Sequence, residues 1–164
     1  MSAAARVVVA PVDLDDPVQA AAFLDLLDHY ARDPMGGGTG LKSEVKSRLV
    51  DELRQVPHFH GALAWLDGIP VGLINGFLGF STFAARPLLN IHDIAVREAH
   101  RGAGIGQALL AWAEGRAREL GCCKLTLEVL ANNHRALASY QRAGFAPYVL
   151  DPAAGQALFL QKGL

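Results

Sequence analysis

Apolar residues recur along this chain at two spacings, and each spacing predicts a kind of element. Between residues 18 and 32 they fall at Ala21, Leu24, Leu27 and Ala31, which is the period of an amphipathic helix. Short, denser apolar runs are typical of strands. The predicted helices span residues 18–32, 42–55, 104–120 and 133–143, and the predicted strands span residues 6–12, 59–66, 69–80, 88–96, 124–130, 145–150 and 157–161.

Residues between these runs predict how the elements connect. Asp67-Gly68 is a strong signal for a two-residue hairpin, so the flanking strands should lie side by side and antiparallel. The helix over 104–120 leads from one strand to the next, which predicts a parallel crossover between 88–96 and 124–130. The prediction is an α/β protein of the α+β mixed-sheet kind, in the order β-α-α-β-β-β-α-β-α-β-β.

One predicted loop has an unusual composition. Residues 33–40 hold one proline and four glycines, so they cannot continue the preceding helix. Two interpretations stay open for this segment: a mobile rim over a substrate site, or a plain linker between two helices.

Composition narrows the class of protein. A chain of 164 residues with 51% hydrophobic content predicts a single domain over residues 1–164. Its 15 basic and 16 acidic residues give a net charge of −1, which argues against nucleic acid or an anionic membrane as partner. The amino terminus shows no signal-like core, and no apolar run reaches the roughly 18 residues of a bilayer span. We therefore expect a soluble, cytoplasmic protein.

The two cysteines, Cys122 and Cys123, are adjacent. Neighbouring cysteines seldom pair, and a reducing compartment keeps them as thiols. The favoured interpretation is two small, half-buried residues entering a strand, and the alternative is a redox or covalent role.

Residues Arg101–Gly106 form a glycine-rich turn between a predicted strand and a predicted helix. Glycines at 102, 104 and 106 permit a tight turn, and the first turn of a helix offers unpaired N–H groups at the positive end of its dipole. Such a site binds phosphate. A dinucleotide-binding turn needs a further glycine where this chain has Gln107, and the P-loop ending is absent. A nucleotide-binding module is therefore a disfavoured alternative.

A second motif lies on the helix predicted over 133–143. Asn133, Ala136 and Tyr140 are three and four residues apart, so they share one helix face, and Gly144-Phe145 follows. Together the two motifs resemble R/Q-x-x-G-x-G/A and N-x-x-A-x-x-x-Y of the GNAT (Gcn5-related) superfamily of N-acyltransferases. The resemblance extends from about residue 59 to residue 162.

The resemblance implies a fold, a cosubstrate and the residues that hold it. In the GNAT fold, two central parallel strands splay apart and acyl-CoA lies between them. The implied cofactor-binding residues are the strand edge at Ile94, Ala95 and Val96, the turn at Arg101, Gly102, Ala103, Gly104, Ile105 and Gly106, and the later motif at Asn133, Ala136 and Tyr140. No metal is implied, and His58 with His60 is a weak metal pattern because a third ligand is missing.

Acyl transfer to an amine needs an acid and a base. Tyr140 is the candidate acid, since a phenol with a pKa of about 10 can protonate a thiolate whose thiol has a pKa of about 8.5. The alternative is a tyrosine packed on Phe145. His92 and Asp93 are the candidate bases, although strand alternation predicts that they face opposite sides of the sheet. Some family members carry a carboxylate where this chain has Asn90, and His92 as a core histidine stays open.

These inferences predict an acetyl-CoA-dependent N-acetyltransferase. The acetyl group would pass directly to a primary amine, from a small molecule or a peptide, in a ternary complex. The alternative is a non-catalytic acyl-CoA-binding or regulatory module on the same fold. The resemblance also makes a homodimer plausible. Asp25, Asp28 and Asp33 either attract a cationic acceptor or form the solvated face of a helix.

Overall fold

The computed structural model describes residues 6–164. Residues 1–5, which are part of the amino terminus where no signal-like core is expected, lie outside it. The chain divides into two compact units, one ending at Leu127 and the other running from Glu128 to Leu164. That residues 1–164 form a single domain stays a prediction. None of the helices in the described part combines the length and apolar character that a bilayer span requires.

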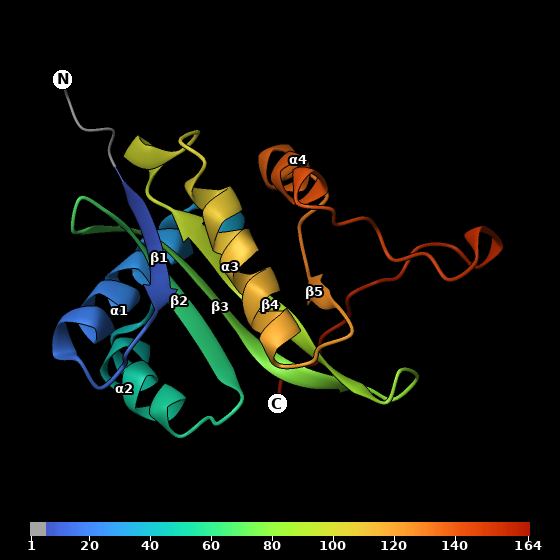
Figure 1. The fold of residues 1–164 in the computed structure, drawn as a ribbon, viewed down its shortest axis with the longest axis horizontal. Coiled ribbons are helices and arrows are strands. Elements are labelled where there is room, and N and C mark those ends of the chain that lie inside the picture. The colour runs from blue at the N-terminus through green and yellow to red at the C-terminus, as the bar shows by residue number, and fades with distance from the viewer. Residues whose placement is uncertain (1–5) are drawn as a thin grey trace. The chain divides into compact units, whose positions relative to one another are not determined.

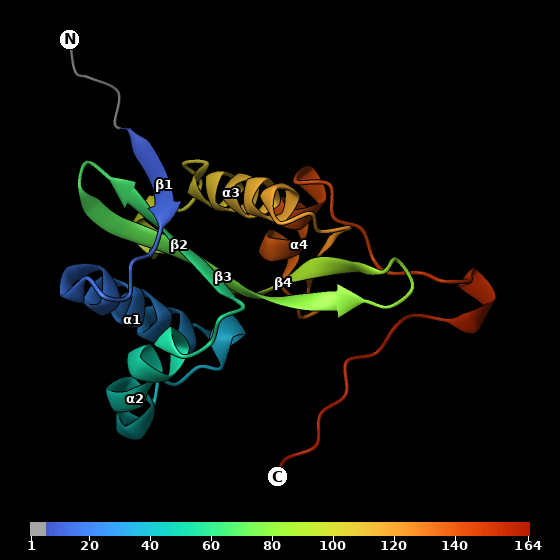
Figure 2. The same cartoon turned by 60° about the horizontal axis from the view of Figure 1, so that its bottom comes forward.

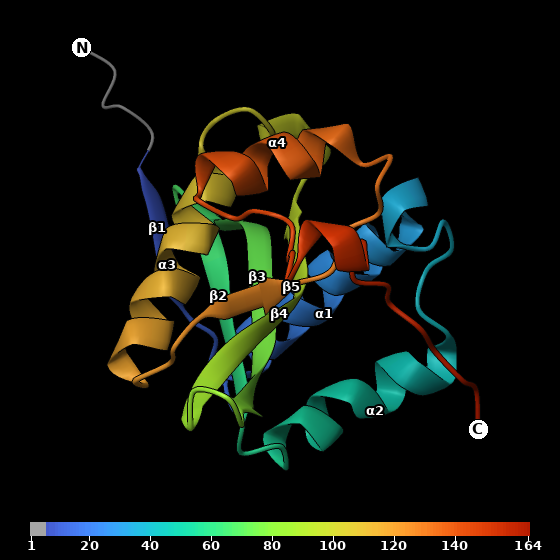
Figure 3. The same ribbon diagram turned by 90° about the vertical axis from the view of Figure 1, so that its right-hand side faces the viewer.

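The first unit is built on one five-stranded mixed sheet (Figure 1). Its spatial order follows the chain, with antiparallel neighbours except for the last, parallel pair. The last strand, residues 125–127, lies at one edge of the sheet, beside the strand with which it pairs in parallel (Figure 3). The strands are β1 Val7–Pro11, β2 Phe59–Leu66, β3 Ile69–Ser81, β4 Arg86–Val96 and β5 Leu125–Leu127.

Helices cover both faces of this sheet. The helices α1 Pro17–Arg32 and α2 Ser43–Arg54 lie on one face and α3 Ile105–Glu119 on the other (Figure 2). Phe23 and Leu26 of α1 pack with Leu63 and Leu73 of the sheet, all at most 1% exposed. Each such side chain contributes about 1.5–3 kcal/mol to folding. The predicted mixed sheet flanked by helices is confirmed.

Local signals account for the boundaries. Asp16 caps α1 by accepting from the Val18 N–H at 2.9 Å. Asp67 and Gly68 have φ of 49° and 81°, which suits a two-residue hairpin turn, so the predicted hairpin is confirmed. The loop over 33–40 holds a short 3-10 turn, Pro34–Gly36.

The last predicted strands are wrong. Residues 145–150 and 157–161 form no strand in the second unit, which holds α4 His134–Arg142 and the 3-10 turn Pro152–Ala154. Pro147 removes a ladder donor from the first run. In the second run, Leu158 and Phe159 are 81% and 73% exposed. Apolar content alone does not make a strand, because a strand needs a hydrogen-bonded neighbour. The strand predicted over 124–130 is paired only at β5.

Asn133 caps α4, and this cap gives a first prediction. Its Oδ1 accepts a hydrogen bond from the Ala136 N–H at 3.2 Å. We expect Asn133→Ala to cost about 1 kcal/mol of helix stability, seen as roughly fivefold faster amide hydrogen exchange in α4. The adjacent, exposed Asn132 is the matched control, and Asn132→Ala should leave the exchange unchanged. Equal rates in both variants would contradict the capping role.

Candidate active site

The glycine turn has the backbone that the sequence predicts. Gly102 and Gly104 both have φ of 80°, and a Cβ on either would meet nothing within 4 Å. The backbone conformation, and not lack of space, therefore requires glycine. Gly104 is the N-cap of α3, whose first ladder bond runs from the Ala108 N–H to the Gly104 carbonyl at 3.0 Å. The N–H groups of Ile105 and Gly106 precede that bond, so this turn fits a phosphate.

Arg101 makes contacts that the sequence did not predict. Its Nη2 lies 3.0 Å from Oδ2 of Asp33, and its Nε donates to the Val96 carbonyl at 3.1 Å. The two side chains of the ion pair are 26% and 20% exposed. Arg101 thus connects the glycine turn to the loop over 33–40 as well as to the end of β4. Its part in holding a pyrophosphate stays a prediction.

The second half of β4, toward Val96, is paired with a neighbouring strand on one side only. On one side, β4 pairs with β3 along residues 86–96. On the other side, β5 pairs only with Leu89–Ile91, and no other strand of the unit ending at Leu127 takes over from it. Backbone groups around Ile94–Val96 therefore suit an extended ligand such as a pantetheine arm, although the Val96 carbonyl already accepts from Arg101.

His92 and Asp93 lie on the same face of the sheet, which corrects the predicted alternation. The β3–β4 register passes from Asn75 opposite Asp93 to Gly76 opposite Ile91, so His92 is the extra residue of a β-bulge. Asp93 is hydrogen-bonded to Asn75, and the exposed His92 packs its ring 4.8 Å from Phe77. Asn75 and Phe77 are two residues apart on β3 and so share a face. The bulge brings both candidate bases to one side.

Asp93 is a carboxyl group suited to accept a proton. It is half-buried, and Asn75 Nδ2 donates to its Oδ2 at 3.0 Å. Burial raises the pKa of Asp93, and the hydrogen bond from Asn75 and the nearby His92 oppose that rise. A carboxylate with a raised pKa is a stronger base near neutral pH.

Two residues that interact with Asp93, Tyr30 and Asn75, were not predicted from the sequence. Tyr30, in the last turn of α1, has its phenol pKa raised by burial and then by the negative charges of Asp93 and Asp33. Asn75 is 4% exposed, in a stretch of β3 that is otherwise glycine and apolar. A polar side chain inside such a stretch is itself a signal, because buried polar groups need a partner. No comparable signal marked Tyr30.

The later motif lies in the second unit. Tyr140 of α4 is half-buried, with its ring 5.9 Å from that of Phe145. Asn133 uses its Oδ1 to cap the helix at Ala136, which gives the Asn and Ala positions of the motif a structural role. The ring contact agrees with the packing interpretation of Tyr140, and the roles of these residues toward acetyl-CoA stay predictions.

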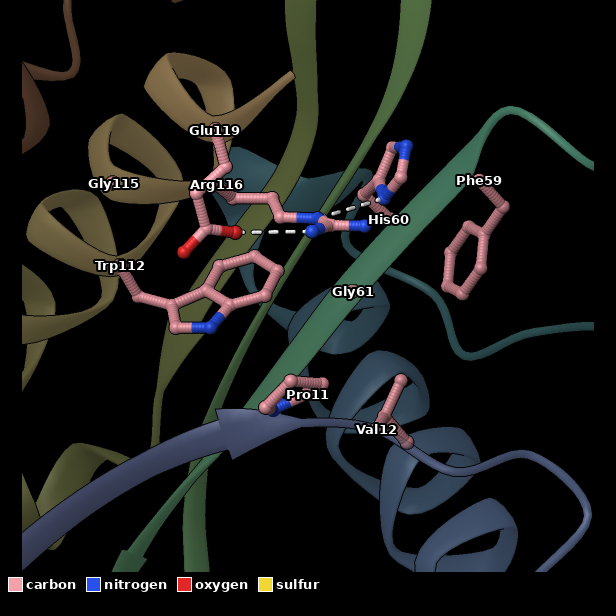
Figure 4. A pocket seen from close by; sticks show the side chains of 9 residues that line it. All are labelled: Pro11, Val12, Phe59, His60, Gly61, Trp112, Gly115, Arg116 and Glu119. Atoms are coloured by element: carbon pink, nitrogen blue, oxygen red, sulfur yellow. Dashed lines mark hydrogen bonds and ion pairs between the residues drawn. The ribbon is translucent and has the colours of Figure 1, made fainter.

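A separate pocket lies between α3, the end of β1 and the start of β2 (Figure 4). It has a volume of about 550 Å³. Nε of Arg116 donates to Nδ1 of His60 at 3.4 Å, and Nη1 of Arg116 lies 3.0 Å from Oε2 of Glu119. None of the residues lining the pocket belongs to the glycine turn or the β4 bulge. Its lining residues are Pro11, Val12, Phe59, His60, Gly61, Trp112, Gly115, Arg116 and Glu119.

The weak metal pattern is not supported by the side-chain positions. His58 packs against Phe77, on the α1 face, whereas His60 contacts Arg116 on the α3 face. Residues 6–164 contain no group of three His, Cys, Asp or Glu side chains that could hold a metal ion.

The aspartates of α1 and of the loop after it are already paired with cations. Asp25 pairs with Arg97, and Asp33 pairs with Arg101. Asp28 lies 2.9 Å from Lys46, whose hydrogen bond is the main reason that the pKa of Asp28 is lowered to about 2. Their charges are therefore largely compensated within the fold, which weakens the idea that they attract a cationic acceptor.

The fold and site together define a class. Three features of the sheet are typical of a group-transfer enzyme with a phosphate-bearing donor. They are a glycine turn at a helix start, an open strand edge and a half-buried carboxyl group. The model of the acetyltransferase (GNAT) family matches residues 23–145. The chain therefore belongs to this family, as the resemblance implied, and the family's description as an acetyltransferase agrees with the predicted enzyme class.

Individual relatives agree with this assignment. The chain is 44% identical over 82 residues to streptothricin acetyltransferase of Streptomyces lavendulae, covering 50% of this chain and 43% of that protein. It is 29% identical over 142 residues to the uncharacterized N-acetyltransferase YycN of Bacillus subtilis, covering 79% of this chain and 89% of that one. The match thus spans less than half of the first relative.

A solved structure shows the same fold. AAC(6')-Iy, in complex with a bisubstrate analogue of CoA and acetylneamine, superposes with a TM-score of 0.75 at 16% identity, covering 97% of this chain and 99% of that one. This confirms the predicted GNAT-type fold.

Proposed function

We propose that this chain transfers an acetyl group from acetyl-CoA directly to a primary amine, with both substrates bound at once. One observation carries the proposal: within a single unit, the fold combines a glycine turn whose backbone suits a phosphate with the Asp93 carboxyl group, on the strand whose open edge leads to that turn. Family membership supports the reaction class.

Each step of the transfer has a residue suited to it. Acetyl-CoA supplies the acetyl group as a thioester, and the backbone N–H groups of Ile105 and Gly106 would hold its pyrophosphate. A primary amine has a reference pKa of about 10.4, so it must lose a proton before it attacks. Asp93, with His92 beside it on the same face, would accept that proton. Tyr140 would protonate the departing sulfur.

The acceptor is proposed to be a small-molecule amine. The relative with 44% identity is named for acetylation of streptothricin, and another, 34% identical over 89 residues, is named an aminoalkylphosphonate N-acetyltransferase. Both names describe small amines. Peptide amines belong in the same acceptor panel, because the names of relatives do not restrict this chain.

A homodimer in the cytoplasm completes the proposal. In the second unit, large apolar side chains are exposed: Tyr148 by 63%, Leu150 by 79% and Leu160 by 82%. Exposed apolar side chains that lie together mark association surfaces, and sedimentation of the purified protein tests whether these side chains do so. Cys122 and Cys123 are both free thiols, as is typical of a reducing compartment.

The deciding experiment measures release of the CoA thiol from acetyl-CoA across a panel of amines that includes streptothricin, aminoalkylphosphonates and peptide amino termini. We expect release with one class of amine. Binding of acetyl-CoA is measured in parallel by calorimetry. Binding without release for any amine would favour the non-catalytic acyl-CoA-binding module, and absence of binding would contradict the proposal.

Gly104 gives a prediction about acetyl-CoA affinity. An alanine at φ of 80° is strained by about 1–2 kcal/mol, so Gly104→Ala should shift the turn away from the conformation that presents its N–H groups. We expect acetyl-CoA to bind about tenfold more weakly, as measured by calorimetry. Gly115, inside the same helix with open space at its Cβ, is the matched control, and Gly115→Ala should leave the affinity unchanged. Equal affinities in both variants would contradict the role of the turn.

A further inference from the structure

Asn75 is the polar side chain that the sheet places against Asp93. It sits in β3 directly opposite Asp93 of β4, and its Nδ2 donates to Oδ2 of that carboxyl group at 3.0 Å. Asn75 is 4% exposed, so water competes little for this bond. A hydrogen bond from a buried donor to a carboxylate is stronger than one between neutral groups.

The carbonyl oxygen of the same amide has no hydrogen-bond partner among the described residues. Oδ1 of Asn75 is buried and accepts no hydrogen bond from the residues that the structure describes. An unsatisfied buried carbonyl costs about 1–3 kcal/mol, whereas a leucine of similar volume would fill the position without that cost. Packing therefore does not account for an amide here, and its bond to Asp93 does.

The backbone at the bulge holds the two strands close together at this point. A Cβ on Gly76 would lie 2.4 Å from the Asn90 carbonyl oxygen, so only glycine permits this approach of β3 to β4. The register shifts directly after Asn75, and His92 bulges out. The regular pair of Asn75 and Asp93 is thus the last before the bulge, which sets the amide and the carboxyl group face to face.

We propose that Asn75 is a positioning residue, which holds the Asp93 carboxylate at the bulge, oriented and ionised to accept the proton of the incoming amine. This inference rests on the proposed function, in which Asp93 is the base. Asn75 acts only through Asp93, and its amide stabilises the charged carboxylate because Nδ2 can donate to that form.

Two further titratable groups, His92 and Tyr30, interact electrostatically with Asp93. His92 of β4 lowers the pKa of Asp93, as Asn75 does. The charge of Asp93 in turn raises the pKa of Tyr30 in α1. Asp33, which also acts on Tyr30, is paired with Arg101. Removing the Asn75 donor should therefore leave burial less opposed, so that Asp93 binds its proton more tightly.

The test is a carbon-13 NMR titration of the Asp93 carboxyl group in the full chain, with the resonance assigned by its loss in Asp93→Asn. We expect Asn75→Leu to raise the titration midpoint by about one to two pH units. The acid limb of kcat/KM should move by the same amount. Asn75→Asp, which keeps the shape of the amide, should raise the midpoint further, because two adjacent carboxyl groups resist ionising together.

Asn90 offers the matched control. Its Nδ2 donates to Oγ1 of Thr126 at 2.9 Å, and Asn90→Leu removes a similar amide from the adjoining strand without touching Asp93. The Asp93 midpoint should stay at the wild-type value in this variant. An unchanged midpoint in Asn75→Leu, or in Asn75→Asp if the leucine variant does not fold, would overturn the proposal, as would an equal shift in Asn90→Leu. The titration needs no acetyl donor, so failure of wild-type transfer would count against the proposed function separately.

Discussion

Asp93→Asn is expected to lower kcat for acetyl transfer by about 10²–10⁴-fold. The asparagine keeps the shape of the side chain and a place beside Asn75, but it cannot accept the proton of the amine. Affinity for acetyl-CoA should not change, because the turn at Gly104 and the edge of β4 are untouched. The measurements are steady-state release of the CoA thiol and calorimetric binding of acetyl-CoA.

Asp25 provides the control for that substitution. It is an aspartate of the same unit, 65% exposed and paired with Arg97, and Asp25→Asn should keep kcat within about twofold of wild type because exposed pairs contribute little. If Asp93→Asn also kept its kcat, Asp93 would not be the base, and the exposed His92 on the same face would be the next residue to replace.

Asp93→Asn should also be more stable than the wild type at neutral pH. Burial is the main reason that the pKa of Asp93 is raised above its ordinary value. A group with a raised folded-state pKa contributes stability at pH values below its unfolded pKa, and this contribution is lost as the pH rises through the folded pKa. Asparagine cannot ionise, so the difference in Tm should be small near pH 4 and should grow in favour of Asp93→Asn toward pH 7.

The sequence predicted the elements whose signals are local. The hairpin at Asp67-Gly68, the amphipathic helices and the glycine turn all depend on residues close together in the chain, and all are confirmed. The runs at 145–150 and 157–161 lacked that kind of support. A strand needs a partner, and apolar composition alone does not show whether one is present.

The candidate site was predicted by residue type more than by geometry. Alternation along a strand placed His92 and Asp93 on opposite faces, but the bulge beside Gly76 inserts one residue and reverses that inference. Contacts distant in sequence were also out of reach. Nothing in the local pattern indicates that Arg101 pairs with Asp33, 68 residues away, or that the charge of Asp93 acts on Tyr30.

Tyr140→Phe is expected to lower kcat by about 10²-fold or more, if the phenol protonates the departing sulfur. Phenylalanine keeps the ring that packs 5.9 Å from Phe145, so α4 should remain as stable as in the wild type. This separates the two interpretations of the residue, because a packing role needs only the ring and an acid role needs the hydroxyl group. Release of the CoA thiol measures the rate, and amide hydrogen exchange of α4 measures the packing.

Tyr148 is the matched control, since it is a tyrosine of the same unit that is 63% exposed. Tyr148→Phe should leave kcat unchanged, and a loss equal to that of Tyr140→Phe would show that the effect is not specific to position 140. The pH dependence gives an independent test. A base and an acid acting together produce a bell-shaped profile, so Asp93→Asn should remove its acid limb and Tyr140→Phe its basic limb. Because each limb reports a different proton, a variant that lowers the rate at every pH without losing its limb has damaged the structure and not the proton transfer.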